Sequence, residues 1–248
     1  MPARNDERVF KRPKNLNCLL WRYMSFSKFV KFLDSSSLYF PRADMLGDPF
    51  EGSLPYRTVA ERTDRPEYAP EAARVLANQY SMAAFHSRYQ TYINCWHQND
   101  GESAAMWKLY GGSNEAIAIV TTYQRLVDTL DEEYDVGNVM YFDYDKIRFK
   151  EFNAFAPFVM KRKSFAHEQE VRAIRMTHDQ QINEFDEIDP EKAPLGIEHR
   201  VDLKHFLVKV HAAPTCPPWF VDLVRSTVRH FDLETPVYSS ELDKDALF

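Results

Sequence analysis

The chain has 248 residues, of which 44% are apolar and 14% aromatic, so one compact domain with a sizeable core is expected. Its formal net charge of −6 argues against a protein whose main task is to grip a nucleic-acid backbone, because such binding needs clustered excess Lys and Arg. The three cysteines lie far apart without C-x-x-C pairing, which argues against a disulfide framework and a zinc knuckle.

Residues 1–15 are expected to form a mobile polar arm, and residues 16–248 a single domain. The segment from Met1 to Lys14 is charged and contains no apolar leader-like run. No part of the chain approaches the roughly 18 consecutive apolar residues of a membrane-spanning helix. We therefore expect a soluble, cytoplasmic protein without membrane contact.

Strands and helices alternate in the predicted order of elements. The segment 116–120 is apolar without alternation, which is typical of a strand covered on both faces, and it is the predicted centre of the sheet. Other strands are expected at 16–22, 38–41, 91–97, 139–142, 165–174, through Phe206, Val208 and Val210, and at 237–239. Helices are expected after a cap at Ser27, at 71–88, 104–110 and 149–163, and after Pro217.

This order of elements predicts the α+β class. We expect one compact domain with a central mixed sheet, continuous or split, that is flanked by helices.

The segment 165–174 is the strongest candidate for a functional site. Glu168, Glu170 and Arg172 occupy every second position of the predicted strand, which would place them on one face. Two neighbouring acids disfavour each other's ionised form, so at least one should have a perturbed pKa or a neutralising cation. The alternative interpretation is an edge strand with a solvated, charged face.

Short motifs occur in a defined order along nearly the whole chain. They are LWRYM at 20–24, GDPFE at 47–51, CW at 95–96, MWKLYG at 106–111, Lys163, EQEVR at 168–172 and YS at 238–239. In this order they resemble the uncharacterised bacterial family called domain of unknown function 2971. That family name carries no activity, so the resemblance implies a shared set of positions without saying what they do.

A strand with Arg22, a following helix and a late Glu-x-Glu strand are together similar to the layout of ADP-ribosyltransferases. This resemblance implies a split sheet that grips NAD as the substrate, and substitution at the anomeric carbon of the nicotinamide ribose. It implies that Glu170 is catalytic, that Glu168 orients the acceptor, and that Arg22 pairs with the diphosphate. Trp107 or Tyr110 would stack on the nicotinamide. The chain departs from the pattern because it lacks a clear Ser-Thr-Ser motif.

Five further residues complete the predicted ligand-binding set: Tyr23, Asp48, Glu51, Lys163 and Arg172. For Asp48 and Glu51, a turn that caps its own backbone is the simpler interpretation. No metal site is predicted, since the chain has no H-E-x-x-H motif, and no cofactor is assigned beyond NAD as a candidate substrate. A small nucleotide is the candidate partner.

Two other classes of function stay open. A nuclease or phosphodiesterase would use Asp48, Glu51, Glu168 and Glu170 as ligands of paired Mg²⁺, with Lys163 at the leaving phosphate. A non-catalytic sensor or interaction module, of the kind found in phage-defence systems, would use the cluster around Arg22 to hold a nucleotide or a peptide.

Structural explanations exist for the same residues. Arg22 would pair with Glu168 or Glu170 across adjacent strands. Every version of the site predicts that Arg22 lies within salt-bridge distance of these acids, in a concave pocket. Cys95 and His97 share a face of an extended strand, and a histidine can activate a thiolate, but no third, orienting group is visible.

Overall fold

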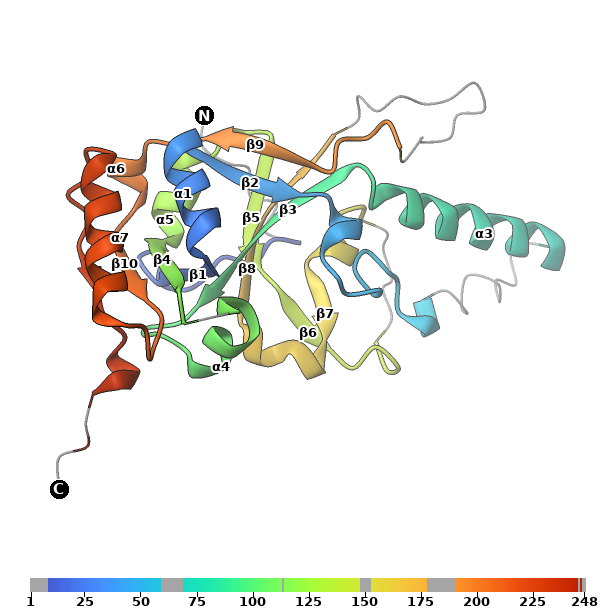
Figure 1. Ribbon diagram of the computed structural model, residues 1–248. Coiled ribbons are helices and arrows are strands. Elements are labelled where there is room, and N and C mark those ends of the chain that lie inside the picture. The colour runs from blue at the N-terminus through green and yellow to red at the C-terminus, as the bar shows by residue number, and fades with distance from the viewer. Residues whose placement is uncertain are drawn as a thin grey trace.

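A seven-stranded mixed sheet forms the centre of the structure (Figure 1). The computed structural model describes residues 9–58, 69–112, 114–147, 153–177, 191–244 and 246. The sheet contains β1 (Leu19–Ser25), β3 (Thr91–Gln98), β4 (Ala116–Thr122), β5 (Tyr134–Asn138), β8 (Glu170–Met176), β10 (Lys209–Ala212) and β11 (Val237–Tyr238). Two small sheets pair β2 (Ser37–Pro41) with β9 (Gly196–Arg200), and β6 (Met140–Phe142) with β7 (Met160–Arg162).

The strands of the main sheet follow the order β11-β10-β4-β1-β3-β8-β5. Neighbours are antiparallel except for β10 and β11, which are parallel. The predicted α+β class with a single compact domain and a mixed sheet is confirmed. The segment predicted as the centre is β4, whose apolar residues are fully buried, but β1 takes the middle position.

Helices from both halves of the chain surround this sheet. The helices are α1 (Phe26–Ser35), α3 (Pro70–Ser87), α4 (Ala104–Met106), α5 (Tyr123–Thr129), α6 (Leu203–Phe206) and α7 (Pro218–His230). Shorter turns are η1 (Ala43–Met45), the π-helical η2 (Trp107–Gly111), η3 (Ala156–Phe158), η4 (Lys163–Glu168) and η5 (Glu241–Asp243). None of the helices in these ranges has the length and apolar character that crossing a bilayer requires.

Local sequence explains where the helices begin. The α1 helix is capped by Ser25 rather than by Ser27, because the Ser25 hydroxyl accepts a hydrogen bond from the Lys28 amide. The α7 helix has Pro218 in its first turn, where the missing amide hydrogen costs nothing. In Figure 1, α3 projects from the body of the molecule on the side opposite to α7.

The two faces of the main sheet bury different clusters. One face carries Leu20, Met24 and Trp96 and is covered by apolar side chains of α1, α5, α6 and α7. The opposite face carries Trp21 and Tyr23 on β1, which pack against the α4–η2 segment. Because strand side chains alternate, Arg22 projects toward the helix-covered face.

The part of the predicted N-terminal arm that the structure describes, from residue 9, contacts the domain. Val9 and Phe10 are buried in a cluster with Phe158 and Ile174, and the Lys11 carbonyl accepts a hydrogen bond from the Asn138 amide. The chain is therefore packed from residue 9 onward, because two apolar side chains in a charged segment find a core site. Residues 1–8 lie outside the described ranges.

Three predicted elements differ from the structure. The strand predicted through Phe206, Val208 and Val210 includes only Val210, because Phe206 lies in α6 and β10 begins at Lys209. The described part of 149–163 is not a helix but η3 followed by β7, and Pro157 interrupts helical hydrogen bonding there. The strand predicted at 165–174 begins only at Glu170, because 163–168 form a 3₁₀ helix that Gln169 ends with a positive φ of 40°. The segments that became α5, β5, β7 and β9 were not predicted as separate elements.

The main sheet opens between β1 and β3. These strands pair only at Leu20 with Gln98 and at Trp21 with His97, whereas β1 pairs with β4 over all seven of its residues. Beyond Trp21, the edge of β3 instead meets β2, where the side-chain nitrogen Nδ2 of Asn94 donates to the Tyr39 carbonyl oxygen at 2.8 Å. The sheet is thus continuous at one end of β1 and split at the other.

Candidate functional site

A cavity of about 300 Å³ lies where β1 and β3 part. Its wall is formed by β1 and the first turn of α1, and its floor by β3, β7, β8 and the end of η4. The cavity is lined by Trp21, Arg22, Tyr23, Lys28, Pro41, Leu46, Asp48, Glu51, Ile93, Cys95, Trp96, His97, Met106, Tyr110, Lys161, Glu168, Glu170 and Arg172.

Lys161 joins the two predicted acids in the floor of the cavity. Its Nζ donates to Glu168 Oε2 at 2.5 Å and to Glu170 Oε1 at 2.6 Å. The second oxygen of Glu168 accepts a hydrogen bond from the Tyr110 hydroxyl at 2.7 Å. All three charged side chains are at least nine-tenths buried, so their interactions are little screened by solvent.

Arg172 extends the network to a third acid. Its Nε donates to Glu170 Oε2 at 2.6 Å, and its two terminal nitrogens donate to the oxygens of Glu51 at 2.6 and 3.0 Å. Nη1 also donates to the Phe158 carbonyl oxygen at 2.7 Å. Arg172 is therefore held by two carboxylates and one carbonyl in a fixed orientation.

The two floor acids differ in their affinity for a proton. Burial raises the pKa of Glu170, but the charges of Arg172 and Lys161 outweigh burial, so the pKa lies well below its usual range. Burial and a hydrogen bond with Glu170 raise the pKa of Glu168. The two acids are coupled through this contact and through Lys161, and their pKa values are shifted in opposite directions.

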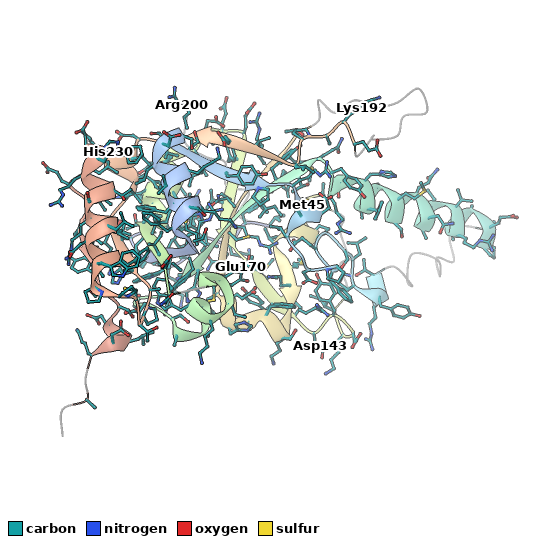
Figure 2. The ribbon with its side chains drawn as sticks, in the orientation of Figure 1. Met45, Asp143, Glu170, Lys192, Arg200 and His230 are labelled. Atoms are coloured by element: carbon teal, nitrogen blue, oxygen red, sulfur yellow. The ribbon has the colours of Figure 1, made fainter. Side chains whose placement is uncertain are left out.

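Local backbone geometry brings these acids together. Glu170 is the first residue of β8, opposite His97 on β3, and Glu168 ends η4. The left-handed conformation of Gln169 turns the chain between them, so that both carboxyl groups reach Lys161. Figure 2 shows Glu170 near the middle of the molecule, whereas His230 lies on α7 at its periphery.

Arg22 lines the same cavity without contacting its acids. Among the described residues, its guanidinium forms no ion pair within 4.0 Å, and its one hydrogen bond runs to the Tyr39 carbonyl oxygen at 3.3 Å. The guanidinium lies 5.8 Å from the centre of the Trp96 ring. Burial lowers the pKa of Arg22 to about 10, so it stays charged at neutral pH. The expected salt bridge from Arg22 to the acidic strand is wrong, because alternation points Arg22 and Glu170 to opposite faces of the sheet.

The other predicted residues fall into two groups. Asp48 and Glu51 line the cavity, and Asp48 also caps the Phe50 amide and pairs with Arg162. Trp107 is buried in the core next to Tyr23, and its indole nitrogen donates to Glu102 at 2.8 Å, so it does not line the cavity. The predicted cation Lys163 is exposed on η4 and also does not line it.

Sequence reasoning missed the cation that the acids use. Lys161 lies in a segment that was predicted as a helix, where nothing in the pattern pointed it toward Glu168. Lys161 is the middle residue of β7, two positions before the predicted cation Lys163, which begins η4. Lys28, Trp96 and His97 also line the cavity and were not in the predicted set.

The acids in the floor of the cavity are paired with protein donors, an arrangement that suits stabilisation of a developing positive charge better than binding of a metal ion. Within the described ranges, no group of three His, Cys, Asp or Glu side chains is arranged to hold a metal ion. The oxygens of Glu51, Glu168 and Glu170 are instead occupied by Lys161, Arg172 and Tyr110.

Comparisons with known proteins add no relative. No family model, no curated protein and no solved structure matches the chain.

Proposed function

We propose that this chain is an NAD-using enzyme of the ADP-ribosyltransferase type that acts in the cavity between β1 and β3. The observation that supports the proposal best is the pair formed by Glu168 and Glu170. The pKa of Glu168 is raised and that of Glu170 is lowered, and both side chains lie in the floor of one cavity. Neighbouring titratable groups whose pKa values are pushed apart are typical of acid–base and charge-stabilising sites.

Glu170 has the charge that substitution at the nicotinamide ribose requires. As the bond from the anomeric carbon to nicotinamide breaks, positive charge develops on the ribose ring. A fixed carboxylate in a water-poor cavity stabilises that charge and orients the ribose hydroxyl groups. Lys161 and Arg172 hold Glu170 ionised and in place, since each contacts one of its oxygens.

Arg22 and Lys28 supply a complementary positive wall. Arg22 has donors without a carboxylate partner, and a planar guanidinium suits the oxygens of a diphosphate. Lys28 lies in the first turn of α1 and is exposed to the same cavity. A ligand with a ribose at one end and a diphosphate beside it matches a cavity with acids in its floor and unpaired cations on its wall.

The order of the sequence motifs supports placing the chain with the family called domain of unknown function 2971. Trp21, Arg22, Asp48, Glu170 and Arg172 come from three motifs of that set, and all line this one cavity. In this proposal the family's shared positions build a nucleotide site.

The metal-dependent phosphodiesterase is the weaker alternative. Divalent cations need free carboxylate oxygens, and here Lys161 and Arg172 already neutralise Glu51, Glu168 and Glu170. A metal ion would have to displace two buried cations from their partners.

Titration with NAD tests the proposal. Binding is followed by calorimetry and nicotinamide release by chromatography, for the wild type, Glu170→Gln and the control Glu198→Gln, whose side chain is paired with Lys31 on the surface. We expect NAD binding in all three, and a release rate that falls by roughly 100- to 1,000-fold in Glu170→Gln alone. Binding without release would indicate the non-catalytic sensor, and no binding at millimolar NAD would contradict the proposal.

A further inference from the structure

The ring of His97 is the least explained polar group in the cavity. It lies on β3 opposite Glu170, is about 95% buried, and lines the cavity next to Glu168. Nδ1 lies 2.6 Å from the backbone carbonyl oxygen of Glu168. Nε2 is buried, and none of the described residues forms a hydrogen bond with it. A buried unpaired nitrogen is costly and calls for a function or a ligand.

The contact at Nδ1 determines the tautomer. A carbonyl oxygen only accepts hydrogen bonds, so Nδ1 must be the nitrogen that carries the hydrogen. Burial lowers the pKa of His97, which keeps the ring neutral at physiological pH. Nε2 therefore presents a free lone pair. Tyr23 of β1 contacts the ring, Glu170 of β8 lies opposite His97, and Glu168 and His167 of η4 act on its pKa. Lys161 of β7 and Tyr110 of η2 line the same cavity.

The other titratable groups of the cavity are poorly suited to take a proton. Tyr110 and Lys161 occupy both oxygens of Glu168, and the low pKa of Glu170 makes it a weak base. Burial, with a further contribution from Glu170, raises the pKa of Cys95 to about 12, so its sulfur stays a thiol. Burial also raises the pKa of Tyr110. A Cys95 thiolate activated by His97 is thus not the chemistry that this environment supports.

We propose that His97 Nε2 is the general base that activates the acceptor, and that the acceptor is water or another hydroxyl nucleophile. This inference rests on the proposed NAD-using function. The bond from the anomeric carbon to nicotinamide breaks, and its electron pair leaves with the nicotinamide nitrogen. A bond forms from the acceptor oxygen to that carbon, and the acceptor proton moves to Nε2 and later to solvent.

The class of acceptor follows from the base. A carboxylate acceptor carries no proton and needs no base, and a guanidinium acceptor has a pKa above about 12, too high for a buried imidazole to remove its proton. A neutral hydroxyl group is the nucleophile that gains most from a positioned lone pair. In this arrangement Glu168 orients the acceptor without deprotonating it.

The test compares His97→Gln and His97→Ala with the control His230→Gln, which alters an exposed side chain on α7 (Figure 2). The rate of nicotinamide release in water should fall by roughly 100-fold or more in both His97 variants, with little change in KM for NAD. The wild-type rate should fall as the pH drops through the pKa of His97, and the variants should lose this dependence. Added azide, an anion that needs no base, should restore the rate of His97→Ala.

The outcomes separate this inference from the proposed function. Two results would overturn the role of His97 while leaving the proposed function intact. One is nicotinamide release by His97→Gln at the wild-type kcat, and the other is a slow release by His97→Ala that azide does not restore. If the wild type neither binds nor cleaves NAD, both proposals fail together. Nitrogen NMR of the wild type gives a readout without turnover: a hydrogen on Nε2 instead of Nδ1 would also overturn the assignment.

Discussion

Two arginines line the same cavity in opposite electrostatic settings. Arg172 in the floor contacts Glu170, Glu51 and the Phe158 carbonyl oxygen, and these carboxylates raise its pKa although burial opposes this. Arg22 in the wall has one hydrogen bond to a carbonyl oxygen, and burial lowers its pKa. A cation paired with carboxylates stabilises the fold, whereas a half-buried cation that no described carboxylate contacts is destabilising until an anion binds it.

The largest predicted effect is on folding and comes from Arg172. Arg172→Met leaves the buried Glu51 without its cation and Glu170 with Lys161 alone, which should cost about 3–5 kcal/mol of unfolding free energy. Urea denaturation measures this loss. The control is Arg175→Met on the same strand, whose partner Glu133 is largely exposed and whose loss should cost about 1 kcal/mol or less. Equal losses in both variants would contradict the division between floor and surface.

The second prediction concerns pH and the two floor acids. The pKa of Glu170 is lowered on folding, so its stabilising contribution is present above the unfolded value of about 4.3 and is lost as the pH falls through the folded pKa. The pKa of Glu168 is raised, so its contribution is present at low pH and is lost as the pH rises.

Isosteric variants separate these opposite contributions. At pH 7, Glu170→Gln should lower the unfolding free energy by about 1.5–3 kcal/mol, because two charge-assisted hydrogen bonds lose their anion. Glu168→Gln should change it by less, because the raised pKa of Glu168 means that folding disfavours its ionised form. Unfolding curves between pH 3 and 7 should show the deficit of Glu170→Gln shrinking toward acid. A deficit that is constant over this range would contradict the assignment.

Arg22 should affect ligand affinity more than stability. Arg22→Met should weaken binding of ADP-ribose by roughly 10- to 100-fold, as expected when a charge-assisted contact to phosphate is lost. The unfolding free energy of Arg22→Met should change by less than about 1 kcal/mol, since no described carboxylate pairs with Arg22 and would lose its cation. Calorimetry and denaturation of one preparation measure both quantities, with Lys31→Met on the exposed side of α1 as control. A destabilisation as large as that of Arg172→Met would remove the contrast between the two arginines.

The smallest effect is expected at Tyr110. Tyr110→Phe removes the hydroxyl that donates to Glu168, which should cost about 1 kcal/mol of unfolding free energy. That hydrogen bond lowers the pKa of Glu168, so its removal should raise the pKa further. Carbon NMR of the side-chain carboxyl group follows this titration, and a downward shift would contradict the proposed network.

Several features of the fold follow from the sequence alone. The apolar run of β4 and the apolar periodicity of α1 and α7 predicted their elements, because burial on both faces or on one stripe leaves a local pattern. The run around Glu168, Glu170 and Arg172 was singled out either as a candidate site or as a solvated edge strand, and the burial of all three side chains shows that the solvated interpretation is wrong. Buried ionisable residues need partners of opposite charge, and within this stretch Glu170 and Arg172 are partners of each other.

The partners of that cluster were decided by tertiary structure. Glu51 is 121 positions from Arg172, and no local pattern indicates that contact. Gln169 interrupts the predicted alternation with a positive φ, which only the surrounding turn determines. The place where β1 leaves β3 depends on long-range strand pairing, and it determines that Arg22 lines the cavity without reaching the acids. Residue types and local periodicity determine which segments are helices and strands, whereas register and long-range packing determine which charges meet.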